Sequence, residues 1–157
     1  MEKIVTSLWF EKDVEEAVNF YVSLLPNSHV DLIGTLAAET PSGPPGSVKM
    51  INFTLMGQPF FAMEAEKLDP FNHAISLTVN CDTQEEIDRL WDALGEGGTV
   101  EQCGWLKDRY GVSWQIVPSK IIEMMSDEDQ TRARRVAEAM LQMVKFDIAA
   151  LERAFGG

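Results

Sequence analysis

The chain has 157 residues, of which 45% are hydrophobic and 24% are charged, a length that suits one domain or two small modules. It carries 25 acidic and 13 basic residues, a formal net charge of −12. This balance argues against nucleic acid and anionic membrane surfaces as partners, because both select a basic face. Two cysteines are too few for a disulfide framework. The N-terminus lacks the pattern of a secretion signal, and no stretch approaches the roughly 20 apolar residues of a membrane span. We therefore expect a cytoplasmic protein.

The first part of the chain alternates apolar, β-rich runs with turn signals, which predicts strands. The expected strands span residues 4–10, 30–36, 48–56 and 60–64. After the first strand, a helix should begin at Asp13, an N-cap residue with Glu16 as its capping-box partner, and end at Pro26. Residues 40–46 contain Thr, Pro, Ser and Gly alone, which predicts a loop without core-forming residues.

The same order of elements then begins again. The expected strands span residues 74–79, 100–103, 105–109 and 113–117. A helix should start at Asp82-Thr83 and end at the glycine-rich residues 95–98. Glu15-Glu16-Ala17 in the first helix corresponds to Glu85-Glu86-Ile87 in the second. Any two amphipathic helices match at this level, but the repetition of the whole order favours an internal duplication of a βαβββ unit.

The C-terminal segment, residues 119–157, has a different character. A short helix is expected over residues 120–125, and Ser126-Asp127-Glu128-Asp129 is a helix N-terminal signal. Apolar residues then recur every three or four positions, which predicts one continuous helix of roughly 25 residues. The members of this stripe are Val136, Met140, Val144, Ile148, Leu151 and Phe155. Such a stripe can pack on the body of the protein or on a second subunit.

Three segments carry a family resemblance: Glu-Glu-Ala-Val-Asn-Phe-Tyr at 15–21, Val-Asn-Cys-Asp-Thr-Gln-Glu-Glu at 79–86, and Cys-Gly-Trp-Leu-Lys-Asp-Arg-Tyr-Gly-Val-Ser-Trp-Gln at 103–115. Together they resemble the PhnB-like branch, often labelled 3-demethylubiquinone-9 3-methyltransferase-like, of the glyoxalase/bleomycin resistance/dioxygenase (vicinal oxygen chelate) superfamily. The resemblance covers about residues 3–118. It implies an α+β fold over 1–118, with two βαβββ modules (about 1–66 and 72–118) whose curled mixed sheets surround a cleft. Residues 119–157 would then be a C-terminal helical extension. It also implies a homodimer.

The resemblance also locates where a metal site would lie. Metal-dependent relatives use one ligand from the first and one from the fourth strand of each module. The corresponding positions here are Thr6, Phe61, Ser76 (or its neighbour Ile75) and Gln115. A divalent metal needs three or four converging His, Asp, Glu or Cys ligands. We therefore expect no metal and no cofactor, although His73 and Glu64 lie close enough in sequence to be recruited.

Other chemistries find little support in the residues. His73 is a candidate general base, and Cys103 a candidate nucleophile, but the sequence indicates no histidine partner for this thiol. A small buried thiol is the alternative interpretation of Cys103, and of Cys81 as well. Methyl transfer from S-adenosylmethionine would need a glycine-rich turn between a strand and a helix. The only glycine cluster, residues 95–98, follows a helix instead.

What remains is a cleft with apolar and aromatic walls. Strand alternation predicts that Ser113, Gln115 and Val117 face this cleft, while Trp114 and Ile116 face the helices. The full set of candidate ligand-contacting residues is Thr6, Leu8, Phe61, Met63, Ser76, Trp105, Ser113 and Gln115. These side chains either bind a ligand or simply fill the cleft as core. Our hypothesis is a metal-free protein that binds a small apolar or planar molecule. The alternative is a metal-dependent lyase, isomerase or dioxygenase of the glyoxalase type.

Overall fold

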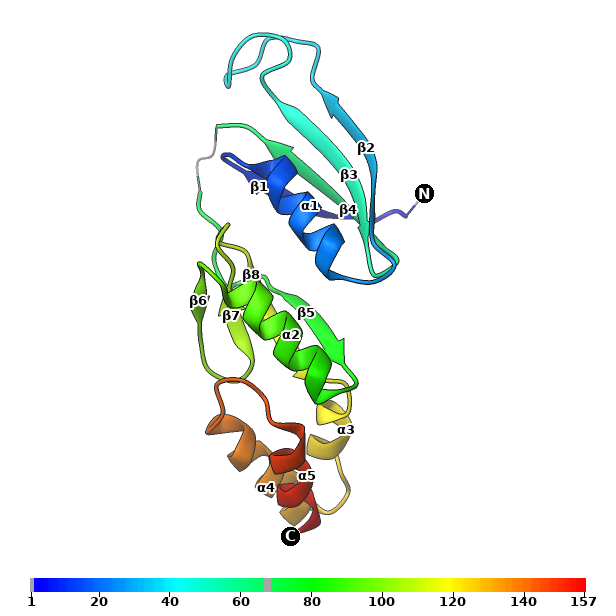
Figure 1. Ribbon diagram of the computed structural model, residues 1–157, viewed down its shortest axis with the longest axis vertical. Helices are drawn as coiled ribbons and strands as arrows, with labels where there is room; N and C mark the ends of the chain where they lie inside the picture. Colours follow the sequence, from blue (N-terminus) through cyan, green and yellow to red (C-terminus); the bar gives the residue numbers. More distant parts are fainter. Residues whose placement is uncertain (1, 67–68) are drawn as a thin grey trace. The chain divides into compact units, whose positions relative to one another are not determined.

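The computed structural model describes residues 2–66 and 69–157 (Figure 1). The chain divides into two compact units, Met1–Pro70 and Phe71–Gly157, and each is described by itself. Within the described residues, the helices are too short or too polar to cross a membrane.

The first unit, called module 1, contains one helix and one mixed sheet. In chain order its elements are β1 (Thr6–Phe10), α1 (Val14–Leu24), β2 (His29–Thr35), β3 (Lys49–Leu55) and β4 (Gln58–Glu64). The strand order is β1-β4-β3-β2, in which β1 runs parallel to β4 and the other neighbours are antiparallel. Helix α1 covers one face of the sheet (Figure 1). Its buried residues Val14, Ala17, Val18 and Tyr21 form the core there, together with Ile51, Phe53 and Ala62.

The start of α1 differs from the expected capping box. Asp13 occupies the N-cap position but has a left-handed backbone (φ 62°), and its side chain makes no capping hydrogen bond. The Val14 amide instead donates to Oε2 of Glu64, at 3.0 Å. A carboxylate from β4 therefore caps the helix, which a search for local capping signals does not reveal.

The second unit begins with a copy of the same arrangement, called module 2. Its elements are β5 (Leu77–Cys81), α2 (Gln84–Gly95), β6 (Thr99–Val100), β7 (Trp105–Lys107) and β8 (Ser113–Pro118), with strand order β5-β8-β7-β6. Strand β5 is parallel to β8, as β1 is to β4. The predicted α+β fold of two βαβββ modules is thus confirmed. That the two sheets share one cleft stays a prediction.

Two strands of module 2 lie elsewhere than expected. The strand expected over 74–79 is found at Leu77–Cys81, and the one expected over 100–103 is only Thr99–Val100. Cys103 and Gly104 both have positive φ angles, 56° and 76°, and the Trp105 amide donates to the Gln102 carbonyl. The chain therefore turns where the sequence suggested an extended segment.

The C-terminal extension is three helices: α3 (Ile121–Met125), α4 (Gln130–Leu141) and α5 (Ile148–Gly156). The prediction of one continuous helix over residues 130–155 is wrong, because residues 142–147 separate α4 from α5. Asp147 caps α5 by accepting a hydrogen bond from the Ala150 amide. The apolar stripe survives in part, since Val136 and Leu151 are buried while Val144 is 39% exposed.

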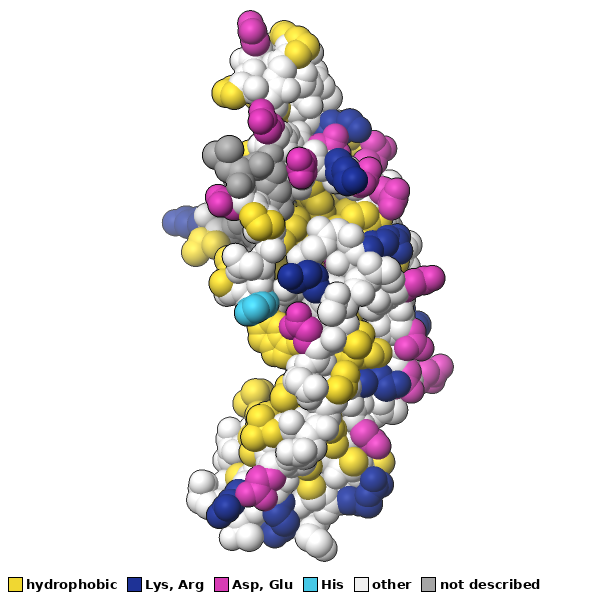
Figure 2. Space-filling model, turned by 90° about the vertical axis from the view of Figure 1, so that its left-hand side faces the viewer, with side chains coloured by type: hydrophobic (Ala, Val, Ile, Leu, Met, Phe, Trp, Pro, Cys, Tyr) yellow, Lys and Arg dark blue, Asp and Glu magenta, His cyan; other side chains and the backbone are white. Residues whose placement is uncertain are grey.

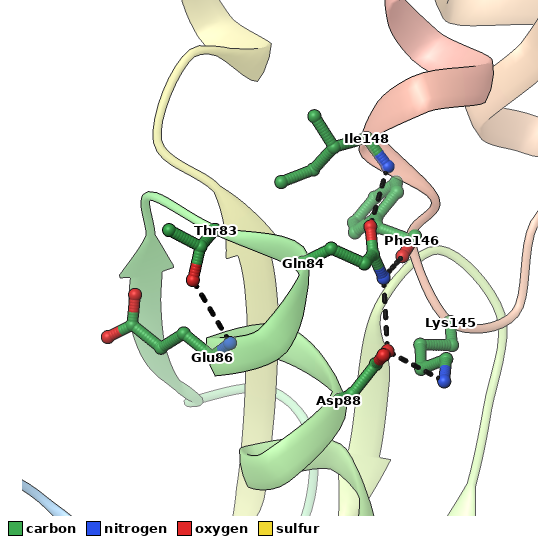
Figure 3. Close-up of polar contacts among 7 residues, drawn as sticks. All are labelled: Thr83, Gln84, Glu86, Asp88, Lys145, Phe146 and Ile148. Atoms are coloured by element: carbon green, nitrogen blue, oxygen red, sulfur yellow. Dashed lines mark hydrogen bonds and ion pairs between the residues drawn. The ribbon is translucent and has the colours of Figure 1, made fainter.

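The segment between α4 and α5 breaks the helix because module 2 satisfies its backbone groups. The amides of Cys103 and Gly104 donate to the carbonyls of Met143 and Val144, at 2.9 and 2.8 Å. The Gln84 side chain donates to the Phe146 carbonyl and accepts from the Ile148 amide (Figure 3). These bonds replace helical ones that the sequence pattern assumed. The extension therefore packs on its own module.

An ion pair and a buried ring complete this docking. Lys145 Nζ lies 2.8 Å from Oδ1 of Asp88 on α2 (Figure 3). The Phe146 side chain is 2% exposed. It packs so closely on Gly104 that a Cβ there would come within 2.5 Å of the ring. Gly104 is thus required both by its positive φ and by this contact.

Candidate functional site

Helix α2 covers one face of the module 2 sheet, and the other face carries four of the eight residues predicted to contact a ligand. Trp114 and Ile116 lie on the helix side, 1% and 0% exposed, as predicted. On the opposite face, Trp105 pairs with Gln115 across β7 and β8. The Gln115 amide nitrogen donates to Oγ of Ser76 at 2.9 Å. The structure thus brings Ser76 and Gln115 together on the face of the sheet that carries Trp105.

Ser113 lies on this face too, because it alternates with Trp114 and pairs with Lys107. It is only 3% exposed, so its hydroxyl is largely covered. That these side chains contact a ligand stays a prediction.

A shallow hollow of about 360 Å³ adjoins this group, lined by His73, Glu101, Gln102 and Trp105. The exposed His73 imidazole stands edge-on to the Trp105 ring, with 6.4 Å between the ring centroids. The hollow combines an aromatic wall with groups that donate and accept hydrogen bonds, which suits a planar polar molecule. On the face drawn in Figure 2, hydrophobic side chains form patches between charged ones, and one patch lies beside a histidine.

In module 1 the predicted faces of β1 are wrong by one residue. The register pairs Thr6 with Phe60 and Leu8 with Ala62. Thr6 and Leu8 therefore lie on the helix side, and Leu8 is part of the core at 7% exposure. Phe61 and Met63 lie on the opposite face, where their neighbours on β1 are Ser7 and Trp9. The core needs the apolar Leu8 and Phe10 on its side, and this requirement sets the register.

Trp9, which the sequence analysis did not single out, lines a pocket in module 1. This pocket has a volume of about 350 Å³. Its lining residues are Trp9, Leu36, Thr40, Pro41, Ser42, Val48, Met63, Ala65 and Glu66. The indole N–H of Trp9 donates to the Ala65 carbonyl at 3.2 Å, which fixes the ring. Assigning Leu8 and Phe10 to the core would have placed Trp9 on the opposite face, with Phe61 and Met63.

The loop over residues 36–47 forms one side of the pocket. Its ends are held by backbone bonds from Leu36 to Val48 and from Gly46 to Leu36. The Ser42 hydroxyl accepts from the Glu66 amide at 3.1 Å, which ties the loop to the end of β4. The loop lacks core residues, as expected, yet it contributes Pro41 to an apolar pocket.

Asp108, in the third of the segments that carry the family resemblance, is buried at 3% exposure. Its Oδ1 accepts from the amides of Tyr110 and Val112, and its Oδ2 accepts from Trp114 Nε1 at 2.9 Å. One carboxylate therefore closes the turn between β7 and β8 and anchors a core tryptophan. This part of the motif has a structural role.

The residues at the expected metal positions do not fit a metal. Among the described residues, no three or more His, Cys, Asp or Glu side chains are grouped so that they could hold an ion. Thr6 and Phe61 lie on opposite faces of their sheet. Glu64, the carboxylate named above as a candidate ligand, accepts from the Val14 amide and lies 3.8 Å from Lys49 Nζ.

The two cysteines are free. Cys81 is buried at the end of β5, where desolvation and the nearby Glu86 and Asp82 raise the pKa of its thiol to about 12. It therefore stays protonated, and weakly nucleophilic, at neutral pH. Cys103 is half-buried, with its Sγ 3.6 Å from the Met140 carbonyl of the extension. It contacts the extension, which suits a packing role.

The sequence and the fold were compared with known proteins. The family model described as 3-demethylubiquinone-9 3-methyltransferase matches residues 2–117. The solved structure of a PhnB protein from Bacillus cereus, described as a 3-demethylubiquinone-9 3-methyltransferase, is 35% identical, with a TM-score of 0.66 over 74% of this chain and 99% of its own. A protein from Pseudomonas aeruginosa is 21% identical, with a TM-score of 0.55 over 75% of this chain and 98% of its own.

The fold extends to more distant proteins. The fosfomycin resistance protein FosX from Listeria monocytogenes is 14% identical, with a TM-score of 0.56 over 80% of this chain and 98% of its own. No curated protein matches. The family match covers both modules and ends just before α3, so the extension lies outside it. The chain belongs to the PhnB, or 3-demethylubiquinone-9 3-methyltransferase, family of proteins with the glyoxalase-like fold.

Proposed function

We propose that this protein binds a small planar or apolar molecule and does so without a metal ion. The proposal rests on two features found together in this chain, namely hollows walled by tryptophan, and uncharged residues at the expected metal positions. Each module has a hollow walled by a tryptophan, Trp9 or Trp105. The positions where metal-dependent relatives would hold an ion carry Thr6, Phe61, Ser76 and Gln115 instead.

The ligand chemistry follows from these walls. Indole rings offer flat apolar surface and favour stacked or edge-on aromatic partners. Next to Trp105, the hydrogen-bonded Gln115 and Ser76 supply polar groups of fixed direction. Such a combination orients a planar molecule that has a few polar substituents.

The family description speaks of methyl transfer, but the residues do not support that chemistry here. A nucleotide-type cofactor site needs a glycine-rich turn leading from a strand into a helix. The turns from β1 to α1 and from β5 to α2 consist of Glu11-Lys12-Asp13 and Asp82-Thr83. A metal-dependent reaction is disfavoured as well, because in the described part of the chain no three or more His, Cys, Asp or Glu side chains converge.

Two measurements test the proposal together. Elemental analysis of protein purified without chelators should find no stoichiometric Ni, Zn, Fe or Mn. A thermal-shift screen of aromatic antibiotics, quinones and thiol adducts should give hits, and Trp9→Ala or Trp105→Ala should abolish the hits that depend on its hollow. Near-stoichiometric metal would refute the metal-free function. Hits that survive both substitutions would refute these hollows as the site.

We also propose that the protein is a homodimer. The open face of the module 1 sheet supports this, because Leu32, which does not line the Trp9 pocket, is 62% exposed. A second copy covering the part of this face at Leu32 would remove that apolar surface from water. Sedimentation that finds only monomer at micromolar concentration would contradict the proposal. Free thiols at Cys81 and Cys103 suit a reducing compartment, so we propose the cytoplasm as its location.

A further inference from the structure

We infer that the module 1 pocket binds a cationic amine with an apolar, ring-sized body. This inference rests on the proposed function and goes further, because it assigns the ligand a site and a charge. It concerns the pocket beneath the 36–47 loop, which sequence analysis did not detect.

The interior of the pocket selects the apolar body. Its walls include Trp9, Leu36, Val48 and Met63, and the indole is held by its bond to the Ala65 carbonyl. A volume of about 350 Å³ lies at the lower end of the range for small-molecule sites. One or two fused rings would fill it. The tryptophan face adds attraction for a cation placed over it.

The edge of the pocket selects the charge. Glu66 is the one charged residue among the described residues that line the pocket. Its backbone amide is bound to Ser42, so the 36–47 loop and the residue that carries the carboxylate are fixed to each other. Lys49, on the neighbouring strand, lies within 3.8 Å of Glu64, which caps α1 on the other side of the sheet. The net charge of −12 favours cations further.

The two hydroxyls of the loop can also accept a hydrogen bond from an ammonium group. Thr40 Oγ1 accepts from the Ser42 amide, and Ser42 Oγ accepts from the Glu66 amide. Each oxygen keeps a second lone pair that can accept a hydrogen bond. An ammonium group is a donor alone and matches hydroxyl and carboxylate acceptors. A carboxylate ligand would instead meet Glu66 as a like charge.

Three probes that share a naphthalene ring and are positively charged, neutral or negatively charged test the inference. The probes are 2-naphthylmethylamine, 2-naphthylmethanol and 2-naphthoate, titrated by calorimetry at low ionic strength. We expect the amine to bind about threefold to fivefold more tightly than the alcohol, the upper part of the range for a solvent-exposed ion pair. The carboxylate should bind most weakly. Added salt should reduce the difference.

The variant Glu66→Gln keeps the shape of the side chain and removes its charge. It should bring the affinities for amine and alcohol together. The matched control is Glu96→Gln, which changes the net charge equally at an exposed position just after α2. It should preserve the preference for the amine.

Failure of the inference and failure of the proposed function give different results. If all three probes bind equally, or if Glu66→Gln keeps the preference, the inference is overturned while the proposed function stands. If none of the probes binds, the pocket does not take ligands of this size. The inference then falls, while ligands found at the Trp105 hollow would sustain the proposed function.

Discussion

Removing the Phe146 ring is the strongest test of how the extension joins module 2. The ring is 2% exposed and packs on the backbone of Gly104. Truncation of a buried phenylalanine to alanine costs about 3–5 kcal/mol of unfolding free energy, from lost burial and the cavity that remains. Phe146→Ala should therefore destabilise all of module 2, even though residue 146 lies outside the family match.

The assay is urea unfolding followed by tryptophan fluorescence in a Trp9→Phe background. In that background Trp91, Trp105 and Trp114 all belong to the second unit, so the signal reports its unfolding alone. With an m value of about 2 kcal/mol per molar urea, the midpoint should fall by about 1.5–2.5 M. Phe146→Leu, which leaves less empty space, should give a smaller shift in the same direction.

Phe155→Ala is the matched control. Phe155 is half-buried near the end of α5, with the Arg132 guanidinium 3.8 Å above its ring. The same chemical change should cost less than about 2 kcal/mol there, because the ring loses partial burial and one cation–π contact. If Phe146→Ala shifts the midpoint by less than 0.5 M, or no more than Phe155→Ala does, the extension is an independent appendage and our reasoning is wrong.

Three further outcomes can be checked. Asp108→Asn should lower the unfolding free energy by about 2–4 kcal/mol in the same assay, because an amide cannot accept all three hydrogen bonds that the carboxylate receives; a loss below 1 kcal/mol would contradict the anchoring role. The Lys145 hydrogen bond lowers the pKa of Asp88, and the Asp88 bond raises the pKa of Lys145, so their contribution to stability should disappear as pH falls through the lowered Asp88 pKa, and again as pH rises through the raised Lys145 pKa. A pH titration of the melting temperature in which Asp88→Asn tracks the wild type at neutral pH would count against this pair. Iodoacetamide at pH 8 should alkylate the half-buried Cys103 well before Cys81, whose thiol has a pKa of about 12. Mass spectrometry showing the reverse order would disprove it.

Sequence reasoning succeeded where the signal is local and repeated. The buried residues of α2, Ile87, Leu90, Trp91 and Leu94, recur every three or four positions. Helical spacing of apolar residues and a Thr83 cap that accepts from the Glu86 amide both agree with the tertiary structure there. Alternation along β8 likewise placed Trp114 and Ile116 correctly, because its register was set by a buried core on one side.

Two of the errors share a cause, which is a distant partner that satisfies a backbone group. Glu64 caps α1 in place of Asp13. Gln84 and the amide of Gly104 bind the segment that interrupts the predicted C-terminal helix. The periodic pattern of the stripe was compatible with one helix, and only these contacts from module 2 decide otherwise. The error on β1 has another origin. The faces of this strand were assigned from Thr6, the expected metal position, which put Leu8 on the wrong face. Assigning Leu8 to the core gives the observed faces.

These results separate the residues that identify the family from those that would select a ligand. In the segment over 103–115, Gly104 makes room for Phe146 and Asp108 closes a hairpin. Such positions can be kept by any protein that needs this module, whatever it binds. Trp9 and Glu66, which would set the apolar wall and the charge of the pocket, lie outside the segments that carry the resemblance. A ligand can therefore change between relatives by substitution at such positions without disturbing the hairpin.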